Sequence, residues 1–287
     1  GPQGAQGLSG PTGPTGDAVV RNIPSGNVIT TLDSDGVVGQ RPSVTIGADG
    51  LGLISYADFT NEALKVAHCS NAACTSATIS TLDSDGDVGE ETSITIGADG
   101  LGLISYYDFT NTALKVAHCD NTACTSATTS TLDSVGDVGD QTSITIGADG
   151  LGLISYYDDT NTALKVAHCD NTNCTSATKT TLDSTGNVFS YMSITIGADG
   201  LGLISYRDNS NSALKVAHCD NTNCTSATKT TLDSTGNVGS YVSITIGADG
   251  LGLISYYDST NGDLKVAHCD NTNCTSATKT TLDSTGN

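Results

Sequence analysis

The sequence has no tryptophan, three phenylalanines and few basic residues, and each shortage excludes a class of protein. Without large aromatic side chains a single deep globular core is not expected, and thin layers of small and β-branched side chains suit the 33 glycines better. Acidic residues outnumber Lys plus Arg by 31 to 11, and the net charge of −20 repels phosphate backbones and anionic lipid. No apolar run reaches the roughly 18 residues of a membrane span. Nucleic-acid binding and membrane insertion are therefore not expected.

One unit is repeated five times at a spacing of fifty residues. It first reads SVTIGADGLGLISYAD at Ser43–Asp58, and it returns almost unchanged from Ser93, Ser143, Ser193 and Ser243. We divide the chain into a Gly-X-Y segment at 1–18, a linker with a lone outer strand at 19–42, and a five-repeat domain at 43–287. The repeats cover residues 43–92, 93–142, 143–192, 193–242 and 243–287.

Each repeat carries four strand signals. In the second repeat, Ser93–Ile96 and Leu101–Tyr107 flank Gly97–Gly100, a hairpin turn with Asp-Gly at its tip. Ala113–Cys119 alternates apolar and polar residues, and a Ser/Thr-rich outer strand over about Thr125–Leu132 follows. The short connections predict an antiparallel meander, and fifty residues per meander is the period of a propeller blade. The fold class is therefore all-β, a β-propeller of four-stranded antiparallel blades.

The repeat is similar to a known family. Ser243–Ala267, SITIGADGLGLISYYDSTNGDLKVA, resembles extracellular bacterial and archaeal β-propeller repeats of the type SIAIDxxGxPxISYYDxxNGDLKYA. The resemblance implies the same fold and no single activity. This chain departs from the family by placing Gly where Pro usually follows the turn, and by adding a Cys pair to each repeat.

The first residues form six Gly-X-Y triplets. Gly1–Ala18 predicts a collagen-like segment, because only Gly fits the crowded axis of a triple helix. A flexible Gly/Pro linker is the alternative. The segment resembles that of bacterial collagen-like surface proteins, which implies glycans on Thr12 and Thr15.

The outer strand occurs once more than the inner three. Asn27–Ser34 supplies the first copy and Thr275–Ser284 the last. The N-terminal copy can complete the last blade as a clasp, which leaves Thr275–Ser284 spare. Otherwise the chain continues into further blades beyond Asn287, or the spare strand pairs with a neighbouring subunit.

Ten cysteines form one C-x4-C pair in each repeat. Zinc sites prefer converging C-x2-C pairs, and the His before each first Cys points to the other face of its strand. We therefore predict five local disulfides and an oxidising, extracellular or cell-surface location. The pairs are Cys69 and Cys74, Cys119 and Cys124, Cys169 and Cys174, Cys219 and Cys224, and Cys269 and Cys274.

The repeats differ from one another mainly in two connections. The loop between the second and third strands and the loop that leads to the next repeat both vary, whereas GADG is the same every time and the loop between the third and fourth strands keeps its Cys pair. In an up-and-down blade the two variable loops share one face, which predicts a ligand face there; neutral drift in exposed loops is the alternative. We assign this face to the aspartate that ends each second strand, namely Asp58, Asp108, Asp158, Asp208 and Asp258.

Other ionisable groups give weaker signals. Asp83, Asp85 and Asp87, with Glu90 and Glu91 after them, can bind Ca²⁺ through hard oxygens, or they form a solvated acidic turn. No other cofactor is expected. The His of each repeat, for which a hydrogen-bonding role within its own blade is predicted, falls at 68, 118, 168, 218 and 268.

The high sequence similarity among the repeats favours a structural or adhesive surface protein without catalysis, a component of a fibre, appendage or coat. The first alternative is a multivalent, lectin-like glycan-binding propeller. The second is a degenerate glycosidase-like propeller: Tyr-Asp recurs after the second strand, but no arginine cluster recurs with it. The expected partners are further copies of the chain, in a trimer through the Gly-X-Y segment or a fibre through strand exchange, and surface glycans.

Overall fold

The structure, a computed structural model, describes residues 29–284 apart from the side chains of residues 189 and 190. Within this range the strands form five four-stranded antiparallel sheets, each with its strands in sequence order. The predicted meander blades are confirmed. The Gly-X-Y segment, with Thr12 and Thr15, lies outside the described residues, so its prediction stays a prediction.

We number the sheets as blades 1 to 5 along the chain. Blade 1 contains β1 (Val38–Ile46), β2 (Gly52–Asp58), β3 (Ala63–Cys69) and β4 (Ala77–Asp83). Blade 2 contains β5 (Val88–Ile96), β6 (Gly102–Asp108), β7 (Ala113–Cys119) and β8 (Ala127–Asp133). Blade 3 contains β9 (Val138–Ile146), β10 (Gly152–Asp158), β11 (Ala163–Cys169) and β12 (Ala177–Asp183). Blade 4 contains β13 (Val188–Ile196), β14 (Gly202–Asp208), β15 (Ala213–Cys219) and β16 (Ala227–Asp233). Blade 5 contains β17 (Val238–Ile246), β18 (Gly252–Asp258), β19 (Asp263–Cys269) and β20 (Ala277–Asp283).

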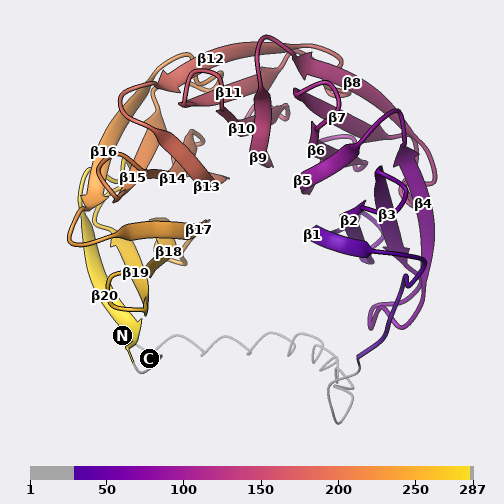
Figure 1. Cartoon of the computed structure of the whole chain (residues 1–287), viewed down its shortest axis with the longest axis horizontal. Coiled ribbons are helices and arrows are strands. Elements are labelled where there is room, and N and C mark those ends of the chain that lie inside the picture. Colours follow the sequence, from indigo (N-terminus) through magenta and orange to yellow (C-terminus); the bar gives the residue numbers. More distant parts are fainter. Residues whose placement is uncertain (1–28, 285–287) are drawn as a thin grey trace, which may run out of the picture.

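The blades follow one another along an arc. Figure 1 shows the first strand of each blade, such as β5 and β9, on the inside of the arc and the fourth, such as β8 and β12, on the outside. The first strands of successive blades pack against each other, but among the described residues blades 1 and 5 do not meet, and the arc is open between them. The last outer strand, β20, pairs with β19 inside blade 5, so the N-terminal copy does not clasp that blade.

The apolar core is divided among the interfaces between neighbouring blades. Between blades 1 and 2, Leu53, Leu64 and Val66 pack against Ile104 and Tyr106, and all five side chains are buried. The other interfaces repeat this arrangement with the residues fifty positions on. Burial of such apolar surface stabilises by about 25 cal/mol per Å². Thin layers of Leu, Val, Ile and Tyr therefore replace one central core, as the composition predicts.

A buried polar clamp crosses each interface. Asp83, at the end of β4, accepts a hydrogen bond from the Tyr106 hydroxyl at 2.6 Å and one from Lys115 Nζ at 2.5 Å, both in blade 2. Burial acts to raise the pKa of Asp83, but these donors outweigh it and the pKa is lowered. The lysine also lies 3.6 Å from Asp108 of its own blade. Each clamp therefore fixes the outer strand of one blade to the middle of the next.

The face opposite the two variable loops is held by disulfides and histidines. All ten cysteines form the five predicted bonds, as in Cys119–Cys124, which confirms the local pairing. Gly102 is required beside this bond, because a Cβ on it would lie 2.7 Å from Cys119 Sγ. His118 Nε2 lies 2.8 Å from Asp99 Oδ2 of the GADG turn, which confirms the predicted role within the blade. Five disulfides indicate a secreted or extracellular protein.

Candidate functional site

The two variable loops do share one face. The backbone N–H of Asp87 donates to Thr110 Oγ1 at 2.7 Å, and the backbone N–H of Phe109 donates to the carbonyl of Asp87 at 2.9 Å. Asp87 belongs to the loop after β4, and the other two residues belong to the loop after β6. Any ligand that reaches this face therefore meets the residues in which the repeats differ.

A β-bulge near the start of each first strand forms part of this face. The β5–β6 register shifts on both sides of Glu90, and Glu91 then takes a left-handed φ of 50° although it is not glycine. The same conformation recurs in every blade, at Arg41, Glu91, Gln141, Tyr191 and Tyr241, with φ between 49° and 59°. A shared backbone thus presents a different side chain from each blade, and strained positions of this kind concentrate at functional sites.

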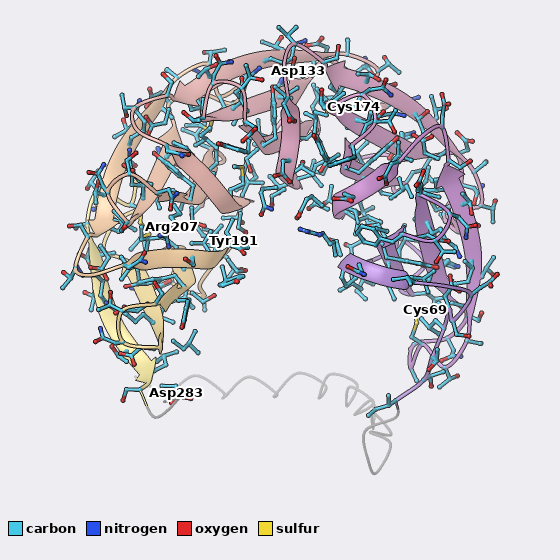
Figure 2. The ribbon with its side chains drawn as sticks, viewed as in Figure 1. Cys69, Asp133, Cys174, Tyr191, Arg207 and Asp283 are labelled. Carbon is cyan, nitrogen blue, oxygen red and sulfur yellow. A yellow bond between two sulfur atoms is a disulfide. The ribbon has the colours of Figure 1, made fainter. Side chains whose placement is uncertain are left out.

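The bulge side chains contact their neighbours along the inside of the arc. The Arg41 guanidinium pairs with the Glu91 carboxylate, and Gln141 Oε1 accepts a hydrogen bond from the Tyr191 backbone N–H at 3.2 Å. The rings of Tyr191 and Tyr241 stand 4.1 Å apart, centroid to centroid. Figure 2 places Tyr191 toward the inside of the arc, whereas Asp133 of a polar clamp lies near its outer rim. The acidic and basic bulge residues thus lie in blades 1 and 2, and the aromatic ones in blades 4 and 5.

A cleft of about 300 Å³ opens where blades 2 and 3 meet on this face. Its volume is at the lower end of the range for small-molecule sites. Its residues come from the bulges of three blades and the variable loops of two, and they are Arg41, Glu90, Glu91, Tyr107, Phe109, Asp137, Asp140, Gln141 and Asp159. Five of the nine are acidic, and the one basic residue is already paired with Glu91.

Two carboxyl groups in the cleft have raised pKa values. Burial, with the nearby Asp87 carboxylate, raises the pKa of Glu90. Burial also raises the pKa of Asp140, and it outweighs the hydrogen bond from the Gln141 backbone N–H and the Arg41 guanidinium, which lower the pKa; the Asp137 and Asp159 carboxylates add smaller increases. Both shifts move a carboxyl group toward the range in which it holds a proton and can act as an acid.

A third carboxylate is oriented by a tyrosine. The Tyr107 hydroxyl donates to Asp137 Oδ1 at 2.7 Å. Burial and this carboxylate raise the pKa of Tyr107 far above its ordinary value, so the hydroxyl keeps its proton and remains a donor. The ring of Phe109 meets that of Tyr107 edge to face at 6.2 Å and is 57% exposed. Two carboxyl groups with raised pKa values, an oriented carboxylate and an accessible aromatic ring therefore line one cleft.

The corresponding region between blades 4 and 5 has a different chemistry. Serines stand where Glu90 and Asp140 stand in blades 2 and 3, and Arg207 replaces Tyr107. Arg207 is buried and donates to Asn237 Oδ1 at 2.5 Å. Tyr241 is 63% exposed, and its ring lies 6.3 Å from that of Tyr257. This end of the face is therefore aromatic rather than acidic.

The predicted ligand residues have a structural role instead. The five aspartates that end the second strands are at most 4% exposed. Asp108 accepts hydrogen bonds from the backbone N–H and the Nδ2 of Asn111, at 2.8 and 3.0 Å, and so caps its own loop. The two variable loops share one face, and the groups that reach the cleft on it are neighbours such as Asp159 and Tyr107. The five buried aspartates that end the second strands are Asp58, Asp108, Asp158, Asp208 and Asp258.

The suggested calcium residues do not converge either. Asp83 belongs to a polar clamp, and Asp85 is exposed in the loop that follows. Over residues 29–284 no group of three or more His, Cys, Asp or Glu side chains is arranged to hold a metal ion. No helix in the same range is long and apolar enough to cross a membrane.

Comparison with known proteins gives the fold. No family model matches the chain, and no curated protein does. A protein of unknown function from Bacteroides caccae is similar in structure, with a TM-score of 0.53 and 10% identity over 83% of this chain and 80% of that one. Dihydro-heme d1 dehydrogenase NirN matches with a TM-score of 0.52 and 11% identity over 82% of this chain and 45% of its own. The α-L-arabinofuranosidase of Lactobacillus brevis matches with a TM-score of 0.47 and 12% identity over 81% of this chain and 84% of its own.

These comparisons correct the functional prediction. The predictions of a structural or adhesive role and of no enzymatic activity are not kept, because several of the matching structures are enzymes, the arabinofuranosidase and an endo-1,4-β-xylanase among them; their TM-scores lie below 0.5, so they assign no activity to this chain. The prediction rested on the similarity of the repeats in sequence, but that similarity belongs to the scaffold, and several of the residues that differ line one cleft. At this level of identity the likeness carries the fold alone, so an activity has to be argued from the cleft.

Proposed function

We propose that this protein binds a neutral saccharide in the cleft between blades 2 and 3 and hydrolyses a glycosidic bond there. Glycoside hydrolysis uses a protonated carboxyl group that donates to the leaving oxygen and a second carboxylate that acts as base or nucleophile. The observation that carries the proposal is the pair of carboxyls with raised pKa, Glu90 and Asp140, beside the oriented Asp137. It corresponds to the glycosidase-like alternative of the sequence analysis.

In this proposal each group has a role. Asp140 is the general acid, because burial raises the pKa of its carboxyl group. Asp137, held by the Tyr107 hydroxyl, is the carboxylate on the other side of the bond. Glu90 is the second carboxyl group whose pKa burial raises, and it donates to a sugar hydroxyl or to the leaving oxygen. The exposed ring of Phe109 supplies an apolar surface for the face of a sugar ring.

The charge of the cleft narrows the substrate class. Five carboxyl groups with one paired arginine repel sialic and uronic acids, so neutral sugars and amino sugars are the expected substrates. We place the reaction outside the cell, or at its surface, because the disulfides require an oxidising compartment.

The test measures turnover of a panel of neutral and anionic aryl glycosides and oligosaccharides. The aglycone released from the aryl glycosides and the reducing ends released from the oligosaccharides are quantified. Asp140→Asn and Glu90→Gln should each lower the rate at least about a hundredfold, as removal of an acid catalyst does. Asp85→Asn, which removes an exposed carboxylate outside the cleft, is the matched control and should turn over like the wild type. Turnover that survives both cleft substitutions, or a preference for anionic sugars, would overturn the proposal.

A second candidate is binding of the same sugars without cleavage, the lectin-like alternative. The observation that favours it is the aromatic cluster of Tyr191, Tyr241 and Tyr257 on the same face. Calorimetry distinguishes the two: saccharide binding with no turnover, lost in Tyr241→Ala and kept in Asp140→Asn, would favour binding alone.

A further inference from the structure

Three blades carry an Asn-Cys-Thr sequence in the loop that the disulfide closes. Asn-X-Ser/Thr, with X other than Pro, is the acceptor sequence for N-linked glycosylation on the surface loops of secreted proteins. The chain contains this sequence at three positions only, Asn173, Asn223 and Asn273, which occupy the same place in blades 3, 4 and 5. The five disulfides already indicate a secreted or extracellular protein, the class in which the sequence is modified.

Both recognition residues of the acceptor sequence lie at the surface. Asn173 and Thr175 are exposed, whereas Cys174 between them is buried in its disulfide with Cys169. The corresponding asparagines and threonines of blades 4 and 5 are exposed as well. A glycan on these asparagines therefore extends into solvent and leaves the packing of the blade unchanged.

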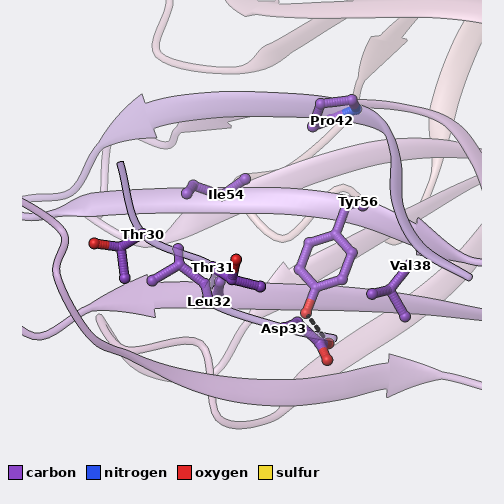
Figure 3. A pocket seen from close by; sticks show the side chains of 10 residues that line it. Thr30, Thr31, Leu32, Asp33, Val38, Pro42, Ile54 and Tyr56 are labelled. Carbon is purple, nitrogen blue, oxygen red and sulfur yellow. Dashed lines mark hydrogen bonds between the residues drawn. The ribbon is translucent and has the colours of Figure 1, made fainter. Parts of the chain in front are cut away.

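The exposed asparagine has no partner within the fold, unlike the polar side chains that serve the scaffold. The Tyr56 hydroxyl, which lines a cavity in blade 1, donates to Asp33 Oδ2 at 2.7 Å (Figure 3). In the disulfide loop of blade 3, Asn171 Nδ2 donates to Thr175 Oγ1 at 2.9 Å, and Asn171 Oδ1 accepts from the Thr175 backbone N–H at 3.2 Å. In the part of the chain that the structure describes, no hydrogen bond or ion pair uses the side chain of Asn173.

Blades 1 and 2 show that the loop forms without this asparagine. Both have alanine at its position, as at Ala123 in blade 2. The Cys124 backbone N–H donates to the Asn121 carbonyl at 2.9 Å, and Cys124 has a φ of 49°. In blade 3 the Cys174 backbone N–H donates to the Asn171 carbonyl at 3.0 Å, and Cys174 has a φ of 51°. The loop is the same with either residue, so the fold does not account for the asparagine.

We propose that Asn173, Asn223 and Asn273 carry N-linked glycans. The donor is a lipid-diphosphate-linked oligosaccharide, and an oligosaccharyltransferase of the secretory machinery transfers it. The amide nitrogen of the asparagine forms a bond to C1 of the first sugar, and the bond between C1 and the diphosphate oxygen breaks. The amide loses one proton and the lipid diphosphate leaves, so the transfer needs no oxidant or reductant.

The glycans project from the face opposite the cleft. In blade 3, Asp158 pairs with Ala163 beside the variable loop that follows β10. At the other end of the same two strands, Leu153 pairs with His168 beside the disulfide loop. The glycans therefore leave the cleft open, and the proposal does not depend on any activity in the cleft.

Secretion of the full chain from a eukaryotic cell line, followed by peptide mapping, tests the proposal. Peptide:N-glycosidase in heavy-oxygen water converts each glycosylated asparagine to a labelled aspartate, so the modified positions are identified one by one. We expect label at Asn173, Asn223 and Asn273 and none at Asn171. Thr175→Ala should remove the label at Asn173 and leave the other two, because it destroys the acceptor sequence of blade 3 alone. Thr175→Ser, which keeps that sequence, should keep all three.

The sharper test is the gain of a fourth site. Ala123→Asn completes the acceptor sequence in blade 2, because Cys124 and Thr125 are already in place, and it should add one glycan at position 123. Ala123→Gln adds an amide without the acceptor sequence and is the matched control, with no fourth glycan expected.

Wild-type protein that is secreted with none of the three asparagines labelled overturns the proposal. A label at Asn173 that survives Thr175→Ala overturns it too, and so does a mass gain in Ala123→Gln equal to that in Ala123→Asn. Glycans confined to Thr12 and Thr15 would be O-linked and would resist the N-glycosidase. That result would leave all three asparagines unlabelled and would likewise contradict the proposal.

Discussion

Replacing Lys115 with methionine tests the polar clamp that joins neighbouring blades. The lysine Nζ lies 2.5 Å from Asp83 Oδ2 and 3.6 Å from Asp108 Oδ2, and the side chain is 11% exposed. Methionine keeps the apolar stem but leaves two buried carboxylates without their cation. Removing one partner of a buried ion pair typically costs 3–5 kcal/mol. Because Tyr106 still donates to Asp83 and Asn111 still donates to Asp108, we expect a loss of about 3 kcal/mol in the free energy of unfolding at pH 7.

The pH dependence of that loss gives the sharper test. In the wild type the pKa of Asp83 is lowered, so its contribution is complete above the unfolded pKa and disappears as the pH falls. In Lys115→Met the effect of burial dominates and raises the pKa of Asp83, so the variant is penalised most at high pH and recovers stability toward pH ~4.5, where the carboxyl takes up a proton. Urea unfolding at both pH values measures the difference. Lys179→Met, whose side chain is 37% exposed and 3.9 Å from Asp133, is the control, with an expected loss below about 1 kcal/mol. The reasoning is refuted if the two variants lose equal stability, or if the Lys115→Met loss does not shrink in acid.

Three further predictions follow from single contacts. Replacing Cys119 and Cys124 together with serine should cost about 2 kcal/mol in urea unfolding, the loop-entropy value for so short a loop, and reducing agent should no longer affect that blade. The Lys265 and Tyr256 donors outweigh burial and hold the pKa of Asp233 at about 2. The free energy of unfolding that this carboxylate contributes is complete above pH ~4 and should decline by about 2 kcal/mol toward pH ~2. In urea unfolding at a series of pH values, Asp233→Asn should flatten this decline, and an unchanged acid slope would contradict the assignment. Gly89→Ala should destabilise far more than Gly39→Ala in the same assay, because both have a left-handed φ but only the first would clash with Leu64; equal losses would show that the φ alone matters.

Much of the scaffold could be predicted because one repeat, read five times, separates what is constant from what varies. The GADG turn, the disulfides and the third strand Ala113–Cys119 follow directly from the alternation and the Cys spacing. The first strand of blade 2, β5, was predicted to begin at Ser93, but it begins at Val88. Gly89 and the bulge at Glu91 interrupt the alternation there, so a pattern with a period of two could not extend through them.

The site itself was only half predictable. The variable loops share one face as the alternation of connections predicts, whereas the aspartate at the end of each second strand is buried and its invariance reflects loop capping. The signal that identifies the cleft was present in the variation at Glu90, Asp140 and their counterparts, which are acidic in two blades and Gln or Ser in the others. That these two carboxyls share a cleft depends on the bulge and on the packing of blade 2 against blade 3, neither of which a single sequence shows.

The most direct measurement of the proposed activity is the pH dependence of neutral glycoside hydrolysis by the wild type and by Asp140→Asn. If the Asp140 carboxyl group, whose pKa is raised, is the acid, the wild-type rate should fall on the alkaline side as that group loses its proton. Asp140→Asn should be at least about a hundredfold slower and should lack this alkaline decline. A wild type that hydrolyses no neutral glycoside at any pH, or a variant whose rate and profile equal those of the wild type, would contradict the account.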